Sequence, residues 1–284
     1  MNALPAASSI ADVPPTLIRP PGQWPDLGLR EAWRLRRVCF VLAQRLLKVR
    51  YRQAVVGVAW ALIQPILLMV AFTVFFGLLA RLPSHDVPYP LFFFSGLVVW
   101  QVTAKMLSEG SSSVLANAAL VTRIYFPRVY FPGAVALSSV VDLFFNFVAL
   151  LLMMFWFGYV PGPAVAVLPL ILLIVYAASL GISLWLAALN VAYRDVAQLI
   201  PFITQVGFFV SPLIYPASIV PEQYQLLYFA NPMALAITGF RWAMLGTPAP
   251  SPGAWVIGSV VAALLLATGY VFFRQREGTF ADRI

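Results

Sequence analysis

The chain has 284 residues, of which 62% are hydrophobic and only 10% are charged. Soluble domains carry about 25% charged residues, so this composition, with its mean hydropathy of +0.88, excludes a soluble globular protein and indicates an integral membrane protein. The apolar segments are far longer than the roughly 9–11 residues of a membrane-spanning strand. Because only helices and closed barrels satisfy their backbone polar groups in lipid, the predicted fold class is all-α.

Several classes of site are excluded by what the sequence lacks. Cys39 is the only cysteine and His85 the only histidine, which rules out an internal disulfide, a thiolate metal cage and a histidine-rich metal site. There is no phosphate-binding G-x-x-x-x-G-K-[ST], no H-E-x-x-H and no G-x-S-x-G. We therefore expect no catalytic residues and no metal site. In a membrane protein, a net charge of +8 reflects first the placement of basic residues on the cytoplasmic side. We therefore expect no nucleic-acid partner.

The N-terminal part divides into two segments. Residues 1–27 are rich in proline, alanine and serine and lack the basic start of a signal peptide, so they are predicted to be a disordered tail. Residues 28–53 are predicted to form a basic amphipathic helix at the membrane surface, whose cations share a stripe about 80° wide. These cations are Arg30, Arg34, Arg37, Arg45, Lys48 and Arg52. The helix is a cytoplasmic anchor, a contact for a partner subunit, or both.

Residues 54–284 are predicted to form one transmembrane domain of six helices. The spans are residues 55–80, 89–119, 133–157, 164–189, 196–215 and 254–273. Residues 216–246 contain another apolar piece, but Asn231-Pro232 interrupts it, and proline disfavours helix in the residue before it. We expect a re-entrant or interfacial hairpin on the outer face, which is tolerated only where protein or a water-filled cavity covers the backbone.

The distribution of cations predicts the orientation. The basic N-terminal segment stays in the cytoplasm, and six crossings return the C-terminus to that side. The cytoplasmic loops and tail then hold Arg123, Arg128, Arg194, Asp195, Arg274, Arg276 and Arg283. Only Arg81 and Arg241 remain outside. The distribution therefore predicts a multi-pass membrane protein with both termini cytoplasmic.

Three charged residues fall inside the spans. Lys105 and Glu109 stand four residues apart in the second span and are expected to pair on one helix face. Ionisable groups within a membrane are functional candidates, although a pair that satisfies itself and faces the bundle interior is an equal alternative. Asp142 is expected to be structural, with a partner that the sequence does not identify.

Several stretches together resemble a known family. "NVAYRDVAQLIPFITQVGFFVSPLIYP", followed by "YFANPMALAITGFRWAMLG", resembles the type-2 ABC exporter permeases that export O-antigen, teichoic acid and capsular polysaccharide. "RYRQAVVGVAWALIQP", "LVTRIYFPRVYFP" and "FRQREGTFADRI" fit the same pattern, so that the resemblance covers residues 47–284. It implies a permease that pairs with a second copy of itself and binds two copies of an ABC-type ATPase. ATP and Mg would reside on that ATPase, with no cofactor in this chain.

The resemblance implies a role for the stretch "RIYFPRVYFP", which lies in the loop between the second and third spans. In this family that loop is a coupling helix that inserts into the ATPase. Aromatic residues and arginine are enriched among interface anchors, and paired prolines restrict a short turn. The implied coupling residues are Arg123, Tyr125, Phe126, Pro127, Arg128, Tyr130 and Phe131. The alternative is an interfacial aromatic belt with cytoplasmic arginines, which needs no paired prolines.

The resemblance also implies an export channel between two permeases for a lipid-linked polysaccharide. Aromatic rings stack on sugar faces without fixing one register, which suits a sliding polymer. The candidate channel residues are Trp60, Tyr89, Phe94, Trp100, Lys105 and Glu109; the alternative for the aromatic residues is packing or lipid contact. A drug or lipid efflux permease of the same fold stays open, and so does a membrane-embedded transferase, which would need clustered acids or histidines.

Overall fold

The structure is a computed structural model that describes residues 36–52, 58–123, 126–193 and 195–284, without the side chains of residues 51, 52 and 58–61. Throughout these ranges the regular secondary structure is helical, with no strand. The all-α prediction is therefore confirmed for this part of the chain. The predicted tail of residues 1–27 and the residues Arg30, Arg34, Tyr125 and Arg194 lie outside the described residues.

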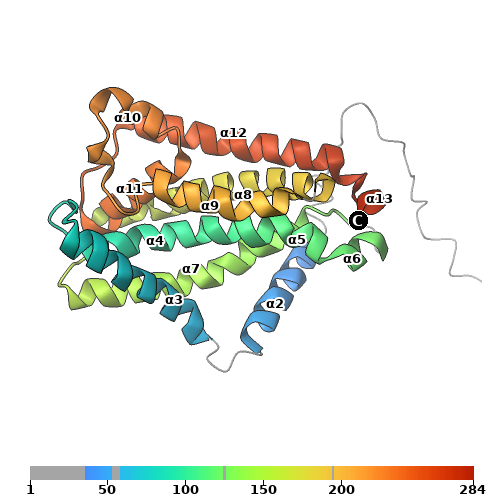
Figure 1. Cartoon of the computed structure of the whole chain (residues 1–284), viewed down its shortest axis with the longest axis horizontal. Helices are drawn as coiled ribbons and strands as arrows, with labels where there is room; N and C mark the ends of the chain where they lie inside the picture. Colours follow the sequence, from blue (N-terminus) through green and yellow to red (C-terminus); the bar gives the residue numbers. More distant parts are fainter. Residues whose placement is uncertain (1–35, 53–57, 124–125, 194) are drawn as a thin grey trace, which may run out of the picture.

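Among the described residues, five helical segments are long and apolar enough to cross a membrane. They are Leu62–Leu79, Tyr89–Ala116, Tyr130–Trp156, Pro163–Ala192 and Pro252–Glu277. The predicted span at residues 196–215, the fifth along the chain, corresponds to α9 (Val196–Val210), which is shorter because the chain becomes extended at Ser211 before Pro212. Proline disfavours helix in the residue before it. In Figure 1, α4, α7, α8, α9 and α12 run along the long axis of the molecule.

Two of these spans contain π-helical segments. Helix α3 (Val58–Phe72) continues into η1 (Thr73–Leu79), and α4 (Tyr89–Lys105) continues through η2 (Met106–Gly110) into α5 (Ser111–Ala116). A π-helix bonds residue i to i+5 and occurs frequently at functional sites. The second segment falls within the predicted span that carries Lys105 and Glu109.

Helix α4 forms the centre of the bundle. In its span, 78% of the most apolar stretch is buried, compared with 6% for the span that contains α3. It packs against α7 (Tyr130–Trp156), α8 (Leu168–Ala192) and α11 (Pro232–Leu245). A membrane helix that is buried on most of its surface must contact protein rather than lipid, so α4 is the element around which the other helices are arranged.

Helices α8 and α12 (Pro252–Glu277) touch through their backbones. A Cβ atom added to Gly181 would lie 2.4 Å from the carbonyl of Leu265, and one added to Gly269 would lie 2.2 Å from the carbonyl oxygen of Gly181. Small residues allow such close approach in membranes, where packing rather than the hydrophobic effect holds helices together. Glycine is thus required at both positions.

The two ends of the bundle differ in structure. At one end lie α10 (Glu222–Tyr228) and α11, within the region predicted as a hairpin, and twelve of the α11 residues are buried. At the other end lie α6 (Ala118–Arg123), α13 (Phe280–Arg283) and the C-terminus (Figure 1). Helix α2 (Arg36–Arg52) packs against α7.

Candidate functional site

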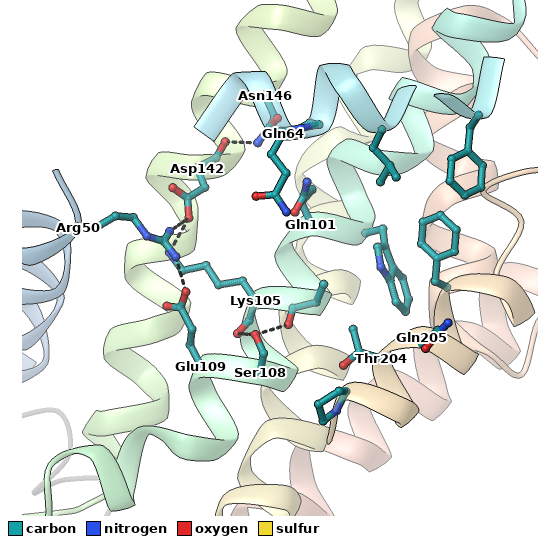
Figure 2. Close-up of a pocket in the computed structure, with 17 residues that line it drawn as sticks. Arg50, Gln64, Gln101, Lys105, Ser108, Glu109, Asp142, Asn146, Thr204 and Gln205 are labelled. Carbon is teal, nitrogen blue, oxygen red and sulfur yellow. Dashed lines mark hydrogen bonds and ion pairs between the residues drawn. The ribbon is translucent and has the colours of Figure 1, made fainter. Parts of the chain in front are cut away.

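A cavity of about 890 Å³ lies between α3, α4 with η2, α7 and α9, with α2 at its edge (Figure 2). Its wall combines side-chain amides and hydroxyls with aromatic rings and one cluster of charges. The uncharged polar residues are Gln64, Gln101, Ser108, Asn146, Thr204 and Gln205, and the aromatic residues are Phe72, Trp100 and Phe208. The cavity thus offers polar and apolar contacts together.

The aromatic wall is built from three helices. The Phe208 ring meets the Phe72 ring edge-on at a centroid distance of 5.5 Å and the Trp100 ring edge-on at 6.1 Å. Gly207 makes room for the indole, because a Cβ atom there would lie 2.8 Å from the Trp100 ring. Edge-to-face pairs of this kind are favourable beyond the area that they bury, so the rings hold one another in place on the cavity wall.

The amide groups supply both hydrogen-bond donors and acceptors. The Asn146 amide nitrogen donates to the backbone oxygen of Asp142 at 2.9 Å. Its side-chain oxygen is buried and accepts no hydrogen bond from the part of the chain that the structure describes. A buried acceptor without a partner costs free energy, so a ligand hydroxyl or a water at this point would stabilise the site.

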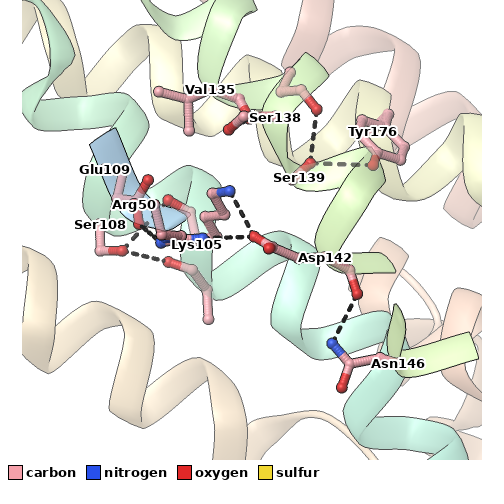
Figure 3. Close-up of polar contacts among 12 residues, drawn as sticks. Arg50, Lys105, Ser108, Glu109, Val135, Ser138, Ser139, Asp142, Asn146 and Tyr176 are labelled. Carbon is pink, nitrogen blue, oxygen red and sulfur yellow. Dashed lines mark hydrogen bonds and ion pairs between the residues drawn. The ribbon is translucent and has the colours of Figure 1, made fainter. Parts of the chain in front are cut away.

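Four charged side chains from four elements meet at one end of the cavity (Figures 2 and 3). Arg50 of α2 donates to Asp142 of α7 at 2.7 Å and also to Glu109 of η2. The ammonium group of Lys105, at the end of α4, lies 2.5 Å from the same Asp142 carboxylate. Two cations face two carboxylates, so the cluster is electrically neutral. The Lys105 and Asp142 side chains are only 9% and 16% exposed.

The expected pairing of Lys105 with Glu109 is wrong, because each has another partner: Lys105 contacts Asp142, and Glu109 contacts Arg50. The reason is the π-helical segment that begins immediately after Lys105. Its wider turns no longer place residues four apart above one another. The partners of Asp142, which the sequence did not identify, are Lys105 and Arg50.

Arg50 was absent from the sequence-based candidates. At about 100° per residue it lies on the side of the helix opposite the predicted basic stripe. This off-stripe position is the signal that could have identified it, since a cation on that side of the helix needs a partner within the protein. Of the stripe itself, Arg37, Arg45 and Lys48 are exposed, and the Arg52 side chain lies outside the described set.

Of the three candidate channel aromatics whose side chains the structure describes, one lies at this cavity. Trp100 lines it, whereas Phe94 is completely buried in the core. Tyr89 is also buried, and its hydroxyl donates to the backbone oxygen of Ile214 at 2.9 Å. Trp60 belongs to α3, but its side chain is outside the described set. The rings that accompany Trp100 are Phe72 and Phe208, which the sequence analysis did not single out.

The residues of the implied coupling loop divide between surface and core. Arg123 is exposed, and Phe126 is half-buried, with its ring stacked on that of Tyr130 and edge-on to Phe131. Tyr130 and Phe131 are buried, and Phe131 is only 2% exposed in a cluster that includes Phe273. Two of the loop's aromatic residues therefore form part of the chain's own core.

The same loop is bonded to the C-terminal end of α12. Pro127 is buried and Arg128 is half-buried, and the Arg128 backbone N–H donates to the carboxylate of Glu277. The Arg128 guanidinium donates to the Glu277 backbone oxygen, and Arg274 pairs with the Glu277 carboxylate. Asp195, the remaining interface candidate, is exposed at the start of α9.

Arg241, which the charge count puts on the outer side of the membrane, is buried within α11. It donates to the backbone oxygens of Phe92, Pro212 and Leu213 at 3.1, 2.5 and 2.8 Å, and its guanidinium lies 3.5 Å from the centre of the Phe92 ring. These bonds satisfy the carbonyls exposed where α9 ends. Guanidinium suits this task because its donors are arranged in a planar fork.

Comparison with known proteins identifies the family. Residues 37–245 match the family described as ABC-2 type transporter, which is more than half of the chain. The chain is 26% identical over 259 residues, covering 90% of itself and 98% of the relative, to an O-antigen export system permease protein of Myxococcus xanthus. It is 28% identical to a protein of the same description from Klebsiella pneumoniae, covering 71% and 77% of the two chains.

A third relative carries a different description. The chain is 21% identical to a polysialic acid transport protein of Escherichia coli, covering 71% of this chain and 78% of the relative. The matched region of the family includes the coupling loop, the charge cluster and every helix of the cavity wall. The chain therefore belongs to the ABC-2 type transporter family, as a multi-pass membrane permease that is not itself catalytic, carries no cofactor and works with an ATPase subunit.

Proposed function

We propose that this permease exports a polysaccharide, carried on a lipid anchor, across the bacterial inner membrane. The observation that carries the proposal is the wall of the 890 Å³ cavity, in which amide side chains lie beside aromatic rings. Sugars present hydroxyl groups at their edges and C–H groups on their faces, so amides and rings suit them together. The relatives named for export of O-antigen and transport of polysialic acid support the same substrate class.

Within this proposal the charged cluster receives the anionic anchor of the substrate. Arg50 and Lys105 supply the cations that a lipid-linked pyrophosphate needs, and charge-assisted bonds to phosphate are among the stronger hydrogen bonds. Glu109 and Asp142 keep the cluster neutral while no substrate is bound. The cluster adjoins the ring wall, so the anchor and the first sugars would contact one continuous surface.

A second copy of the chain completes the channel in this proposal. Helices α3 and α9 border the cavity and also carry exposed apolar residues, among them Leu67, Phe202, Val206 and Phe209. Gln64 and Gln205, on the same two helices, face the cavity. A polar pathway bordered by apolar flanks suits a symmetric pair in which each copy supplies half of the wall.

The proposed topology has six crossings and two cytoplasmic termini. The fifth crossing is α9 with the residues that follow it, α12 is the sixth, and residues 216–246 form the outer hairpin without crossing. This arrangement puts α6, α13 and the basic end of α12 in the cytoplasm, as the charge rule favours. The three domains keep their proposed limits of residues 1–27, 28–53 and 54–284.

The coupling loop is proposed to dock on the ATPase, of which two copies would bind ATP and Mg. Arg123 is exposed and Phe126 half-exposed, so these two residues offer the described part of the docking surface. Tyr130 and Phe131, being buried, would act by holding the loop to the bundle. The exposed side chains of Arg37, Arg45, Lys48 and Asp195 border the same end and are proposed as further interface residues.

Deletion of the gene and complementation in the source bacterium tests the function. Loss of surface polysaccharide on immunoblots, restored by the wild type but not by Trp100→Ala/Phe208→Ala, is the expected result. Phe155→Ala is the matched control, because that ring is 86% exposed and away from the cavity. Normal surface polysaccharide in the deletion strain, accompanied by sensitivity to drugs, would instead establish the efflux alternative.

A further inference from the structure

A second, smaller cavity lies where α8 and α12 end, beside α13. Its volume is about 290 Å³, and Arg276, Arg283, Gln275, Thr279 and Tyr193 contribute polar groups to its lining. The described residues that line it include no carboxylate. Both arginines also lack an ion pair within the part of the chain that the structure describes. The cavity therefore presents two positive charges, which favour the binding of an anion.

The depth of this cavity follows from the length of α12. Val256, Val260 and Leu264 form an exposed apolar stripe on the first half of this helix, and Arg276 lies in its last turn. Val256 and Arg276 stand 20 residues apart in the sequence, which is about 30 Å along a helix. The hydrocarbon core of a bilayer is also about 30 Å thick. When Val256 lies at one boundary of this core, Arg276 lies at the other, among the lipid headgroups.

Aromatic stacking fixes the guanidinium at that level. The Trp185 indole of α8 stacks on the Phe272 ring with a centroid distance of 3.9 Å, and the Arg276 guanidinium carbon lies 4.4 Å from the centre of the same ring. Tryptophan is enriched at membrane interfaces. The column of Trp185, Phe272 and Arg276 therefore marks the boundary and holds one cation of the cavity in a defined position before any ligand arrives.

We propose that the cavity formed by Arg276 and Arg283 binds the phosphate headgroup of an anionic phospholipid from the surrounding membrane. Basic pockets between transmembrane helices bind such headgroups. The lipid phosphate would accept bonds from both guanidinium groups, while Gln275, Thr279 and Tyr193 supply hydrogen bonds to glycerol oxygens. The acyl chains would lie along the exposed apolar stripe of α12. This site is separate from the large cavity and does not depend on the exported substrate.

The test is lipid binding to the purified full-length chain in detergent, measured by native mass spectrometry and by melting temperature. Dioleoyl phosphatidylglycerol, dioleoyl phosphatidylcholine and inorganic phosphate form the three arms. Of these three, we expect only phosphatidylglycerol to form a persistent adduct with the protein and to raise its melting temperature. Arg276→Gln/Arg283→Gln should weaken this binding about 30-fold, because each basic side chain near the surface contributes about 1 kcal/mol.

Matched variants separate a specific site from general charge attraction. Arg37→Gln/Arg45→Gln removes the same charge from exposed positions on α2 and should keep the adduct and its thermal shift. Arg283→Gln alone changes an exposed residue near the C-terminus and gives a second measurement without risk to folding. Retention of the full shift by both Arg283 variants would overturn the proposal. So would an equal shift from phosphatidylcholine or from inorganic phosphate, since either would remove the need for an anionic lipid.

Discussion

The carboxylate of Glu277 accepts a hydrogen bond from the backbone N–H of Arg128, so the end of the last long helix is fastened to the loop that precedes α7. The two residues are 149 positions apart, and Arg128 returns a bond from its guanidinium to the Glu277 backbone oxygen. A displacement of the loop by the ATPase would therefore act directly on α12. Glu277 therefore positions the proposed coupling loop against the end of α12.

Glu277→Ala should uncouple the transporter. Without the carboxylate, the Arg128 N–H loses its acceptor and Arg274 loses its ion-pair partner. We expect ATP hydrolysis by the purified complex to continue while export of polysaccharide falls. Glu277→Gln retains an acceptor oxygen and should restore part of the export. Equal loss of hydrolysis and export, with a lowered melting temperature in both variants, would reduce the role of Glu277 to general stability.

Phe131 and Phe126 should differ in what their removal changes. Phe131 is 2% exposed, and truncating a buried phenylalanine costs about 3–5 kcal/mol of stability, so Phe131→Ala should lower the melting temperature of the permease. Phe126 is half-buried, and Phe126→Ala with Arg123→Ala should weaken copurification with the ATPase while the permease still folds. Normal copurification and hydrolysis in the latter variant would show that the loop is not the docking element.

Lys105→Met should impair export without unfolding the protein. The substitution leaves Asp142 paired with Arg50, so the buried carboxylate still has a cation beside it. Removing both cations, in Lys105→Met/Arg50→Met, takes away two ion pairs of the half-buried Asp142 carboxylate and should lower the melting temperature further. Export in cells and thermal stability of the purified complex are measured together. Normal export of Lys105→Met combined with a strongly lowered melting temperature would make the cluster purely structural.

Thiol labelling tests the topology. Burial raises the pKa of the Cys39 thiol to about 11, and since the thiolate is the reactive form, Cys39 should react little with maleimide at neutral pH and more as the pH rises towards this value. In a Cys39→Ser background, Glu222→Cys should react with an impermeant maleimide added outside, whereas Ala281→Cys should react only after permeabilisation. If position 222 reacts only with maleimide that has reached the cytoplasm, the proposed orientation is wrong.

The sequence predicted the helices better than it predicted their partners. Long apolar runs identified the five long spans, because crossing the hydrocarbon core demands such runs. The end of α9 at Val210 was missed, although Pro212 gave the local signal. The π-helical segment at Met106–Gly110 has no comparable signal in the sequence. It occurs where the helix packs against α7 and α8, and these contacts cannot be read from the local composition.

Side-chain partners depended on contacts between distant residues. Trp100, Lys105 and Glu109, which were taken together as channel candidates, line one cavity, since one helix with its continuation carries all three. Arg50 and Asp142 join them only because α7 packs against that helix and α2 packs against α7, and no spacing along the chain encodes this meeting. Charge counting put Arg241 on the outer side of the membrane but could not show that three carbonyl oxygens, from α4 and the end of α9, accept bonds from it.

The contact between Gly181 and Gly269 limits how the protein can move. With backbone against backbone at this crossing, neither helix can slide or roll past the other without a collision, because packed interfaces switch between discrete arrangements rather than deform continuously. Helices α8 and α12 should therefore keep a fixed position relative to each other during transport. The moving parts during transport would then be α3 and α9, whose exposed faces border the cavity and whose interior prolines, Pro65 and Pro201, supply natural points of flexure.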